Sequence, residues 1–317
     1  MSFYLSVCCG APVEITILIV YLAFSLLSIQ GIVFAEYILL LELNSTTEHI
    51  KTDYTQKLVA NWATICLVCQ SLPAIFSTLY ISTWSDRGGR KISMILPTLG
   101  MLVSSVSFIF MYVYGLPIEY ILIGNLSIGL TGNTILHRSG AGSYISDLCT
   151  QENLTLRMSI LLGISFLAIT LGQLCFSIWI DATGFLQPFI FMTVLLAFSI
   201  FYIVCLMKES VDPSQMQQSF SFKDVVADII SVISSNRNNR RSLMWWLMSA
   251  RILNSILVNS LEFGLQMYSI GPPLYMSTSG AGQFTSAYFL SNTVGKRIIN
   301  NNAPKKSLSH SHSNLTL

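Results

Sequence analysis

Long apolar runs alternate with short polar segments along most of the chain. The runs cover residues 15–41, 58–82, 92–114, 118–145, 158–180, 188–207 and 243–270. Each reaches about the 20 residues that an α-helix needs to cross the hydrocarbon core of a bilayer. The pattern therefore predicts an all-α membrane protein with seven spans, followed by a modestly apolar stretch that has room for the start of an eighth.

The composition agrees with this pattern. Hydrophobic residues make up 52% of the 317 residues, charged residues make up 10%, and the mean hydropathy is +0.62. These values are typical of a protein that crosses the membrane several times. The net charge of +2 is small and gives no sign of nucleic-acid binding.

The basic residues of the polar segments predict the orientation, because cytoplasmic loops carry an excess of Lys and Arg. An N-terminus in the cytoplasm puts most of them inside: Arg87, Arg90, Lys91, Arg157, Lys208, Lys223, Arg237, Arg240 and Arg241. Only Lys51 and Lys57 then fall in an outer loop of the first half. We expect a six-helix half at 1–207, a central cytoplasmic loop at 208–242, a partial second half at 243–295 and a disordered tail at 296–317.

The loop between the second and third spans carries the most specific motif in the chain. Residues 84–91 read Trp-Ser-Asp-Arg-Gly-Gly-Arg-Lys, with an ordered Asp-x-x-Gly-Arg-Lys. This pattern resembles the signature of the major facilitator superfamily, which implies an all-α transporter with a six-helix N-terminal bundle. A plain tight cytoplasmic loop would explain the charges but not their order.

Each residue type in this loop has a physical use. Gly88 and Gly89 permit a tight turn with positive φ, and Asp86 can pair with Arg90. We expect Asp86, Gly89, Arg90 and Lys91 to form a conformational latch, away from any substrate.

The fourth span is the most polar. Asn125, Gly129, Asn133 and His137 recur every four residues and would share one stripe of a continuous helix. Arg138 follows, and a charge inside a membrane span is costly enough to suggest a function as anion partner or charge relay. The alternative is that Arg138 lies near the inner face and snorkels to the lipid headgroups.

Two further polar residues lie inside predicted spans, Gln30 in the first and Glu262 in the seventh. Polar groups at such depth normally face protein or water. The residues predicted to line a substrate site are Gln30, Asn125, Asn133, His137, Arg138 and Glu262.

Several short matches in order resemble the family of the proton-coupled folate transporter and the thymic stromal cotransporter, solute carrier family 46. They are Val13-Glu14, Gln30-Gly31, the sequon-bearing outer loop, Trp84-Ser85-Asp86, Ser146-Asp147, Arg157-Met158, Phe263-Gly264 and Pro273-Leu274-Tyr275. The resemblance covers about residues 13–290. It implies secondary transport of an organic, anionic solute such as a folate-like compound, in symport with protons, at a plasma or endolysosomal membrane.

The chain departs from this family at three positions. Leu161 and Leu162 stand where folate carriers have an acid in the fifth span, Asn133 replaces an acid in the fourth, and Glu262 replaces a histidine in the seventh. These differences leave proton coupling and the identity of the solute open. The family also has twelve spans, and this chain resembles its first half plus a remnant of the second, that is, a C-terminally truncated form.

The truncated length leaves a second function open besides transport. The chain would then be a non-transporting membrane protein that associates with another copy or with a full-length transporter. An enzyme is not expected, because no catalytic set, metal cluster or phosphate-binding loop is recognisable and the histidines are scattered. We expect no cofactor and no metal; the expected partners are an organic solute, protons and the lipid bilayer.

The topology generates a first testable prediction. Asn44-Ser45-Thr46 is a glycosylation sequon in the one long polar outer loop, so Asn44 should carry a glycan. Peptide-N-glycosidase treatment, or the substitution Asn44→Gln, should increase the mobility of the protein on a gel after expression in a glycosylating cell. Unchanged mobility would contradict the orientation, whereas the sequon at Asn153 should stay unmodified because it faces the cytoplasm.

Overall fold

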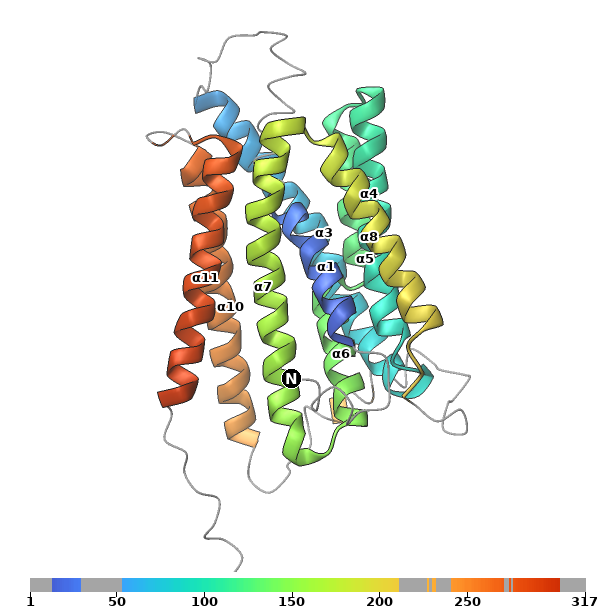
Figure 1. Ribbon diagram of the computed structural model, residues 1–317. Helices are drawn as coiled ribbons and strands as arrows, with labels where there is room; N and C mark the ends of the chain where they lie inside the picture. The colour runs from blue at the N-terminus through green and yellow to red at the C-terminus, as the bar shows by residue number, and fades with distance from the viewer. Residues whose placement is uncertain are drawn as a thin grey trace, which may run out of the picture.

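The computed structural model describes residues 13–29, 53–210, 227, 230–231, 241–270, 274 and 276–302, although not every side chain within them. All regular structure in these ranges is helical, and the helices stand together as a bundle (Figure 1). Four helical segments have the length and hydropathy of membrane spans: Lys57–Asp86, Ile92–Tyr114, Asn153–Thr183 and Leu186–Cys205. The predicted class, an all-α membrane protein, is confirmed.

The described helices follow the predicted runs closely. They are α1 (Val13–Ser28), α3 (Asp53–Gly88), α4 (Ile92–Tyr114), η1 (Ile118–Tyr120), α5 (Ile121–Leu130), α6 (Asn133–Leu148), α7 (Gln151–Thr183), α8 (Leu186–Cys205), α10 (Arg241–Ile270) and α11 (Thr278–Asn302). The runs at 92–114 and 243–270 correspond to α4 and α10. The first run is described only as far as residue 29, so Gln30 and Asn44 lie outside the described residues.

The structure differs from the sequence prediction mainly in the fourth span. The prediction of one continuous helix there was wrong. Gly132 and Asn133 have φ of 89° and 56°, and this left-handed pair separates α5 from α6. Asn133 adopts such a φ more readily than most residues because its short side chain bonds locally; its Oδ1 accepts from the Thr134 amide at 2.6 Å. The four-residue stripe of polar residues is therefore interrupted at Asn133.

Hydroxyl groups from α3 satisfy the backbone at this break. Ser77 Oγ lies 2.7 Å from the Gly129 carbonyl oxygen, and Thr78 Oγ1 lies 3.0 Å from that of Gly132. Within a membrane no water replaces a lost helical hydrogen bond, so irregular backbone needs such protein donors. Because α3 packs directly against α5 and α6, its hydroxyls thus add donors to two carbonyls that also accept the backbone amides of Gly132 and Leu136.

Close packing of α5 on α3 depends on a glycine. A Cβ added to Gly129 would lie 2.6 Å from the Gln70 carbonyl oxygen and 3.0 Å from that of Cys69. Pro73 has no N–H to donate to the Cys69 carbonyl. Gly129 lets the two backbones meet at this point.

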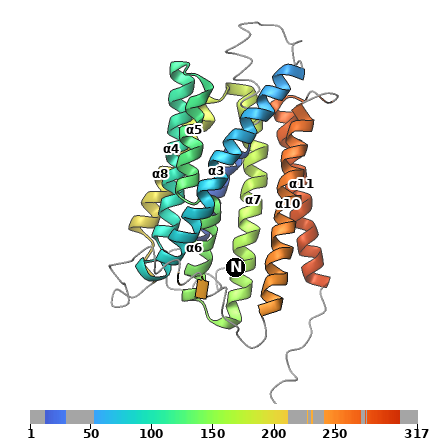
Figure 2. The ribbon, with the colours of Figure 1, turned by 180° about the vertical axis from the view of Figure 1, so that it is seen from behind.

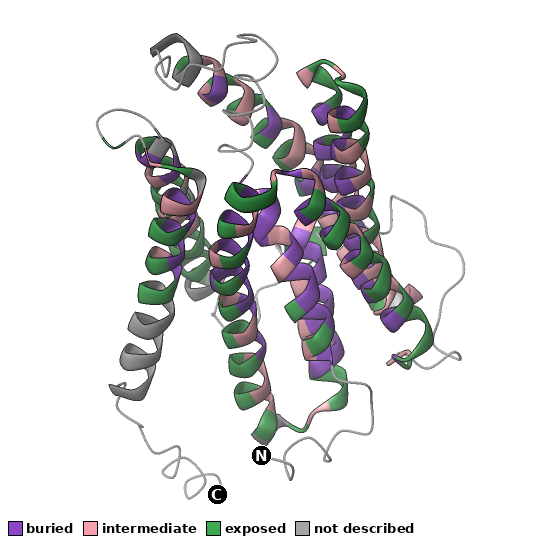
Figure 3. Cartoon of the chain, turned by 45° about the horizontal axis from the view of Figure 1, so that its top comes forward, coloured by how far each residue is buried: buried purple, intermediate pink, exposed green. Residues whose placement is uncertain are grey.

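Apolar side chains fill the bundle in two clusters, one toward each end. Phe108 and Phe189 stack at 3.9 Å between ring centroids in the cluster far from the α3–α4 turn. Tyr21 and Tyr144 belong to the other cluster, nearer that turn. Buried residues lie on the inward faces of the helices (Figure 3), and exposed apolar residues such as Phe76, 74% exposed, cover the outside, as contact with lipid requires.

The helices α10 and α11 stand as a pair on one side of the bundle, next to α7 (Figures 1 and 2). The sequence predicts only the start of an eighth helix before a tail at 296–317, whereas α11 has 25 residues and continues to Asn302. Thr285 and Ser286 are buried on this helix. These polar residues lower the hydropathy of the segment, but they pack against protein and not against lipid. The division into two halves remains a prediction.

The glycine contact between α3 and α5 generates a stability prediction. Gly129→Ala should force the two helices apart and lower the free energy of unfolding by about 1–3 kcal/mol, the usual cost of overpacking. Thermal unfolding of the detergent-solubilised protein measures it. Gly163→Ala in α7 is the matched control, because nothing lies within 4 Å of its added Cβ; equal midpoints for the two variants would contradict the close contact.

Candidate functional site

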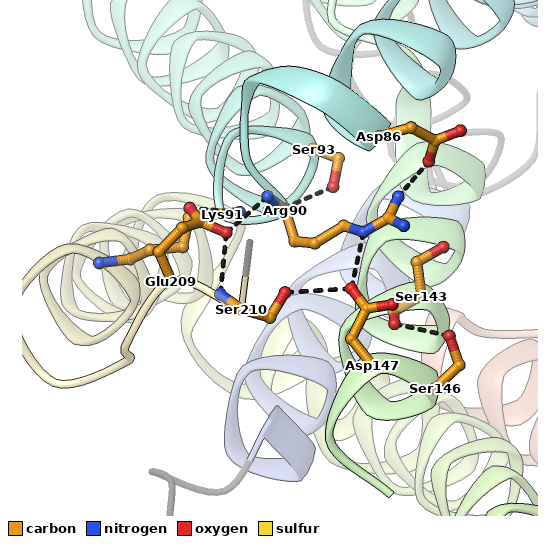
Figure 4. A network of polar contacts seen from close by, with 9 residues as sticks. All are labelled: Asp86, Arg90, Lys91, Ser93, Ser143, Ser146, Asp147, Glu209 and Ser210. Carbon is orange, nitrogen blue, oxygen red and sulfur yellow. Dashed lines mark hydrogen bonds and ion pairs between the residues drawn. The ribbon is translucent and has the colours of Figure 1, made fainter. Parts of the chain in front are cut away.

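The turn between α3 and α4 brings its own basic side chains together with acidic ones from α3, from α6 and from the segment after α8 (Figure 4). The Arg90 guanidinium forms ion pairs with Asp86 at the end of α3 and with Asp147 at the end of α6, the latter at 2.9 Å from Nε to Oδ2. Ser210, just after α8, also donates to Asp147 Oδ2 at 3.1 Å. The pairing of Asp86 with Arg90 that the sequence predicts is confirmed.

Glu209 binds the backbone of the same turn. Its Oε1 accepts from the Arg90 amide at 2.6 Å, and its Oε2 accepts from the Lys91 amide at 3.3 Å. Gly89 has φ of 117°, and a Cβ there would lie 2.8 Å from Glu209 Oε2. Both the backbone conformation and the space therefore require a glycine at 89, whereas Gly88 is the last residue of α3.

The remaining basic residue of the turn is held by a helix end. Lys91 Nζ donates to the Val204 carbonyl at 2.9 Å, in the last turn of α8. A cation is favourable there because the last carbonyls of a helix are unpaired and carry partial negative charge. The partners of the turn named above thus come from α3, α6, α8 and the segment directly after α8.

The charge state of Arg90 is fixed by this network. Burial would lower the pKa of the guanidinium, but the hydrogen bonds and charges of Asp147 and Asp86 outweigh burial and raise its pKa above the usual value. A raised pKa stabilises the fold below the ordinary pKa of arginine, and this contribution is lost only as pH rises through the still higher folded value. Arg90 therefore stays charged at any pH a cell maintains.

A second ion pair joins the same end of α1 to α7. Glu14 accepts a hydrogen bond from Arg157, and the two side chains are 13% and 20% exposed. The sequence drew attention to both residues separately but did not predict that they pair. Asp147, Glu209 and Arg157 are partners from distant spans. The sequence marks each as an acid or base at the end of an apolar run, and marks Asp147 and Arg157 also as parts of family matches, but neither signal gives their partners.

Polar residues inside the bundle are organised around Arg138. Its Nε donates to the Tyr21 hydroxyl at 2.8 Å, and its guanidinium carbon lies 4.9 Å from the centroid of the Tyr21 ring. The Tyr21 hydroxyl donates in turn to the Thr134 carbonyl at 3.3 Å, in the first turn of α6. No carboxylate among the described residues pairs with Arg138, which remains partly exposed.

The other predicted site residues lie apart from one another. His137 is completely buried, and neither of its ring nitrogens has a hydrogen-bond partner among the described residues. Asn125 is 1% exposed on α5, where its Nδ2 donates to the Ile121 carbonyl. Asn133 lies in the break, and the Glu262 side chain and all of Gln30 are outside the description. A solute reaches His137 or Asn125 only if helices separate.

A known protein family matches most of this chain. Residues 14–301 match the family model described as Major Facilitator Superfamily. The chain is 24% identical over 251 residues to the proton-coupled folate transporter of Rattus norvegicus, which covers 77% of this chain and 54% of that protein.

A second group of relatives has a different name. The chain is 24% identical over 231 residues to the lysosomal proton-coupled steroid conjugate and bile acid symporter SLC46A3 of Bos taurus, and likewise to that of Homo sapiens, covering 68% of this chain and 50% of each relative. The chain thus spans about half the length of the curated relatives it matches.

The contacts of the turn predict that its charged residues stabilise the fold more than an ordinary surface charge does. Glu209→Gln should lower the free energy of unfolding by about 1.5–3 kcal/mol, because one backbone amide loses its acceptor and the bond to the other is no longer to a charged group. Lys208→Ala removes the neighbouring exposed charge and is the control. Thermal unfolding measures both, and a Glu209→Gln protein as stable as the control would contradict the network.

Proposed function

We propose that this chain, which belongs to the major facilitator superfamily, is a secondary active transporter that moves an organic anion across a membrane. Membership of a family of transporters, together with the apolar helices, makes it an integral membrane protein. The observation that supports the anion is Arg138, a cation within the bundle whose described polar partner is the neutral Tyr21.

Arg138 is arranged as a binding group whose orientation is already fixed. Tyr21 accepts from Nε, so the hydrogen bond fixes the guanidinium plane, and no other described residue forms a hydrogen bond or ion pair with the terminal nitrogens. A guanidinium offers two parallel N–H donors to a carboxylate or sulfonate, which neutralises the buried charge. A solute anion would therefore supply the partner that no described residue supplies.

The break between α5 and α6 supports the same location. Substrate sites of such transporters are often formed at discontinuous helices, where the positive N-terminal end of a half-helix faces an anion. The helix α6 begins at Asn133 inside the bundle, and Arg138 follows in its second turn. The helix end and the guanidinium thus contribute positive potential to one region.

The relatives' names guide the choice of solute and coupling ion. They refer to folate, steroid conjugates and bile acids, and each says proton-coupled. Folates and bile acids are organic molecules with acidic groups, which suits a guanidinium. We extend proton coupling to this chain, and we retain the plasma or endolysosomal membrane as its location, with the N-terminus in the cytoplasm.

The charged turn has a different role in this proposal. Asp86, Gly89, Arg90 and Lys91 tie α3, α4, α6 and α8 into one unit at the cytoplasmic end. They would set the rate of conformational exchange and leave solute affinity nearly unchanged.

The function generates a prediction for uptake by cells that express this chain alone. A panel of a folate, a bile acid and a steroid sulfate, each tested with and without an inward proton gradient, should contain a transported solute. Arg138→Ala should then lower kcat/KM at least about thirty-fold, because truncating one partner of a buried charge pair costs 2 kcal/mol or more.

Two further variants make the result specific. Arg138→Lys keeps the charge and should retain part of the activity, and Lys57→Ala changes an exposed cation at the start of α3 and should have no effect. Uptake that is insensitive to Arg138→Ala would contradict the anion site. Absence of uptake for the whole panel, with the protein folded and in the membrane, would contradict the transport proposal.

A further inference from the structure

The helices α4 and α5 lie side by side at one edge of the bundle, on the other side from α10 and α11 (Figures 1 and 2). Glycines bring the two backbones together at two levels. A Cβ on Gly100 would lie 2.9 Å from the Ser127 carbonyl oxygen, and one on Gly124 would lie 3.0 Å from the Ser104 Cα. The two helices are therefore in direct contact on the side that faces the bundle.

On the outer side of this contact, a groove with a volume of about 300 Å³ lies between the same helices. Its walls include Val103, Val106, Ser107 and Phe110 of α4, together with Tyr120 at the end of η1 and Ile123 of α5. Val103 is 43% exposed and Ile123 is 56% exposed. The groove is therefore open to the lipid that surrounds the bundle.

The groove occupies one leaflet of the membrane, at the end far from the α3–α4 turn. From Leu102 to Phe110, α4 rises about 12 Å, whereas half of the hydrocarbon core is about 15 Å thick. Tyr114, the last residue of α4, and Tyr120 are both exposed at this end, as is typical of tyrosines at a membrane interface. An occupant would therefore have one end at the headgroups and its body in the hydrocarbon.

The lining is almost entirely apolar. Among its residues, all of which the structure describes, Ser107 and Tyr120 alone have polar side chains. Ser107 Oγ donates within α4 to the Val103 carbonyl at 2.8 Å, whereas the Tyr120 hydroxyl forms no hydrogen bond with a described residue. The groove thus suits a molecule that has one small polar group on an apolar body.

Charge at the polar end distinguishes one membrane amphiphile from another. Residues 114–120 contain no Lys or Arg, and the exposed Glu119 adds a carboxylate next to Tyr120. A phospholipid would bring its phosphate close to this carboxylate, and two like charges repel each other. The single hydroxyl of a sterol is neutral and is not repelled.

The walls also favour a rigid body over a flexible chain. Val103, Val106 and Ile123 are β-branched and therefore stiff about χ1, so the groove keeps its shape. Fused rings lose little conformational freedom when they bind to such a surface, whereas an acyl chain loses freedom at each bond that becomes fixed.

We propose that the groove between α4 and α5 binds a membrane sterol. The sterol hydroxyl lies at Tyr120, and the fused rings pack against Val103, Val106 and Ile123. Arg138 is not among the lining residues, so this site is separate from the proposed solute site and does not depend on transport.

Photolabelling tests the site in the full chain. The protein is reconstituted in phosphatidylcholine vesicles that contain a diazirine analogue of cholesterol, and peptide mass spectrometry locates the label after irradiation. The label should concentrate on residues 102–123, and unmodified cholesterol should displace it. The vesicles supply acyl chains in large excess, so a label spread evenly over the lipid-facing helices, or one that cholesterol does not displace, would overturn the sterol site.

A variant that fills the groove makes the result specific. Val103→Trp should lower the labelling of residues 102–123 at least about five-fold, which corresponds to the lower end of the usual cost of overpacking. Val194→Trp is the matched control, because Val194 is an exposed valine on α8 outside the groove, and it should leave this labelling unchanged.

A second pair of variants tests the polar end. Tyr120→Phe removes only a hydroxyl and should lower the labelling about two- to ten-fold, the range expected from losing one hydrogen bond. Tyr114→Phe, at a more exposed tyrosine outside the groove, should leave the labelling unchanged.

The second pair still decides the outcome if Val103→Trp does not fold, which thermal unfolding in sterol-free vesicles detects. Equal labelling of the two folded tryptophan variants, or of the two phenylalanine variants, would contradict the proposal. The result is independent of the uptake experiment because the labelling needs no solute.

Discussion

The bond from α3 to the break in the fourth span is the contact on which the rest of the first bundle depends. Ser77 and Thr78 supply donors to the Gly129 and Gly132 carbonyls, which also accept the backbone amides of Gly132 and Leu136. These bonds join α3 to the irregular backbone of the break within the membrane. A Cβ on Gly129 would clash with α3. Because α3 and the break fit this closely, the direction of α6 is fixed, and with it the position of Arg138 against Tyr21.

Charge is distributed in this bundle according to the cost of leaving it unpaired. At the turn between α3 and α4, Arg90 has two carboxylates and Lys91 has a helix terminus. Farther inside, Arg138 has a hydroxyl and an aromatic face as described partners, which lower the cost of a buried cation but do not neutralise it. The paired charges are therefore suited to structure, and the incompletely paired one is suited to binding.

The sequence predicts those features that depend on local composition. The spans that became α4 and α10, the tight turn at Gly89 and the pairing of Asp86 with Arg90 all follow from residues close together in the chain. The break at Gly132 and Asn133 does not, because its hydroxyl partners come from α3, more than fifty residues earlier. Local periodicity therefore placed Asn125, Asn133 and His137 on one stripe that the fold interrupts.

The partners of the charged turn escaped prediction for a similar reason. Asp147 and Glu209 reach Arg90 across sequence separations of 57 and 119, and an acid at the end of a span reads as an ordinary interfacial charge. The length of α11 was underestimated because a hydropathy value treats Thr285 and Ser286 as if they faced lipid, whereas both are buried. Periodicity and hydropathy describe one helix at a time, and these features belong to pairs of helices.

The two ends of the molecule are joined by interactions of different strength. The contacts around the turn between α3 and α4 are hydrogen bonds to charged groups, worth about 1.5–3 kcal/mol each, and those described connect helices of the first bundle. The contact between α1 and α10 is a neutral amide bond, and such bonds between membrane helices average about 0.6 kcal/mol. Rigid-body movement requires strong contacts within each body and weak ones between bodies. The placement of charge on one side and neutral amides on the other meets that requirement.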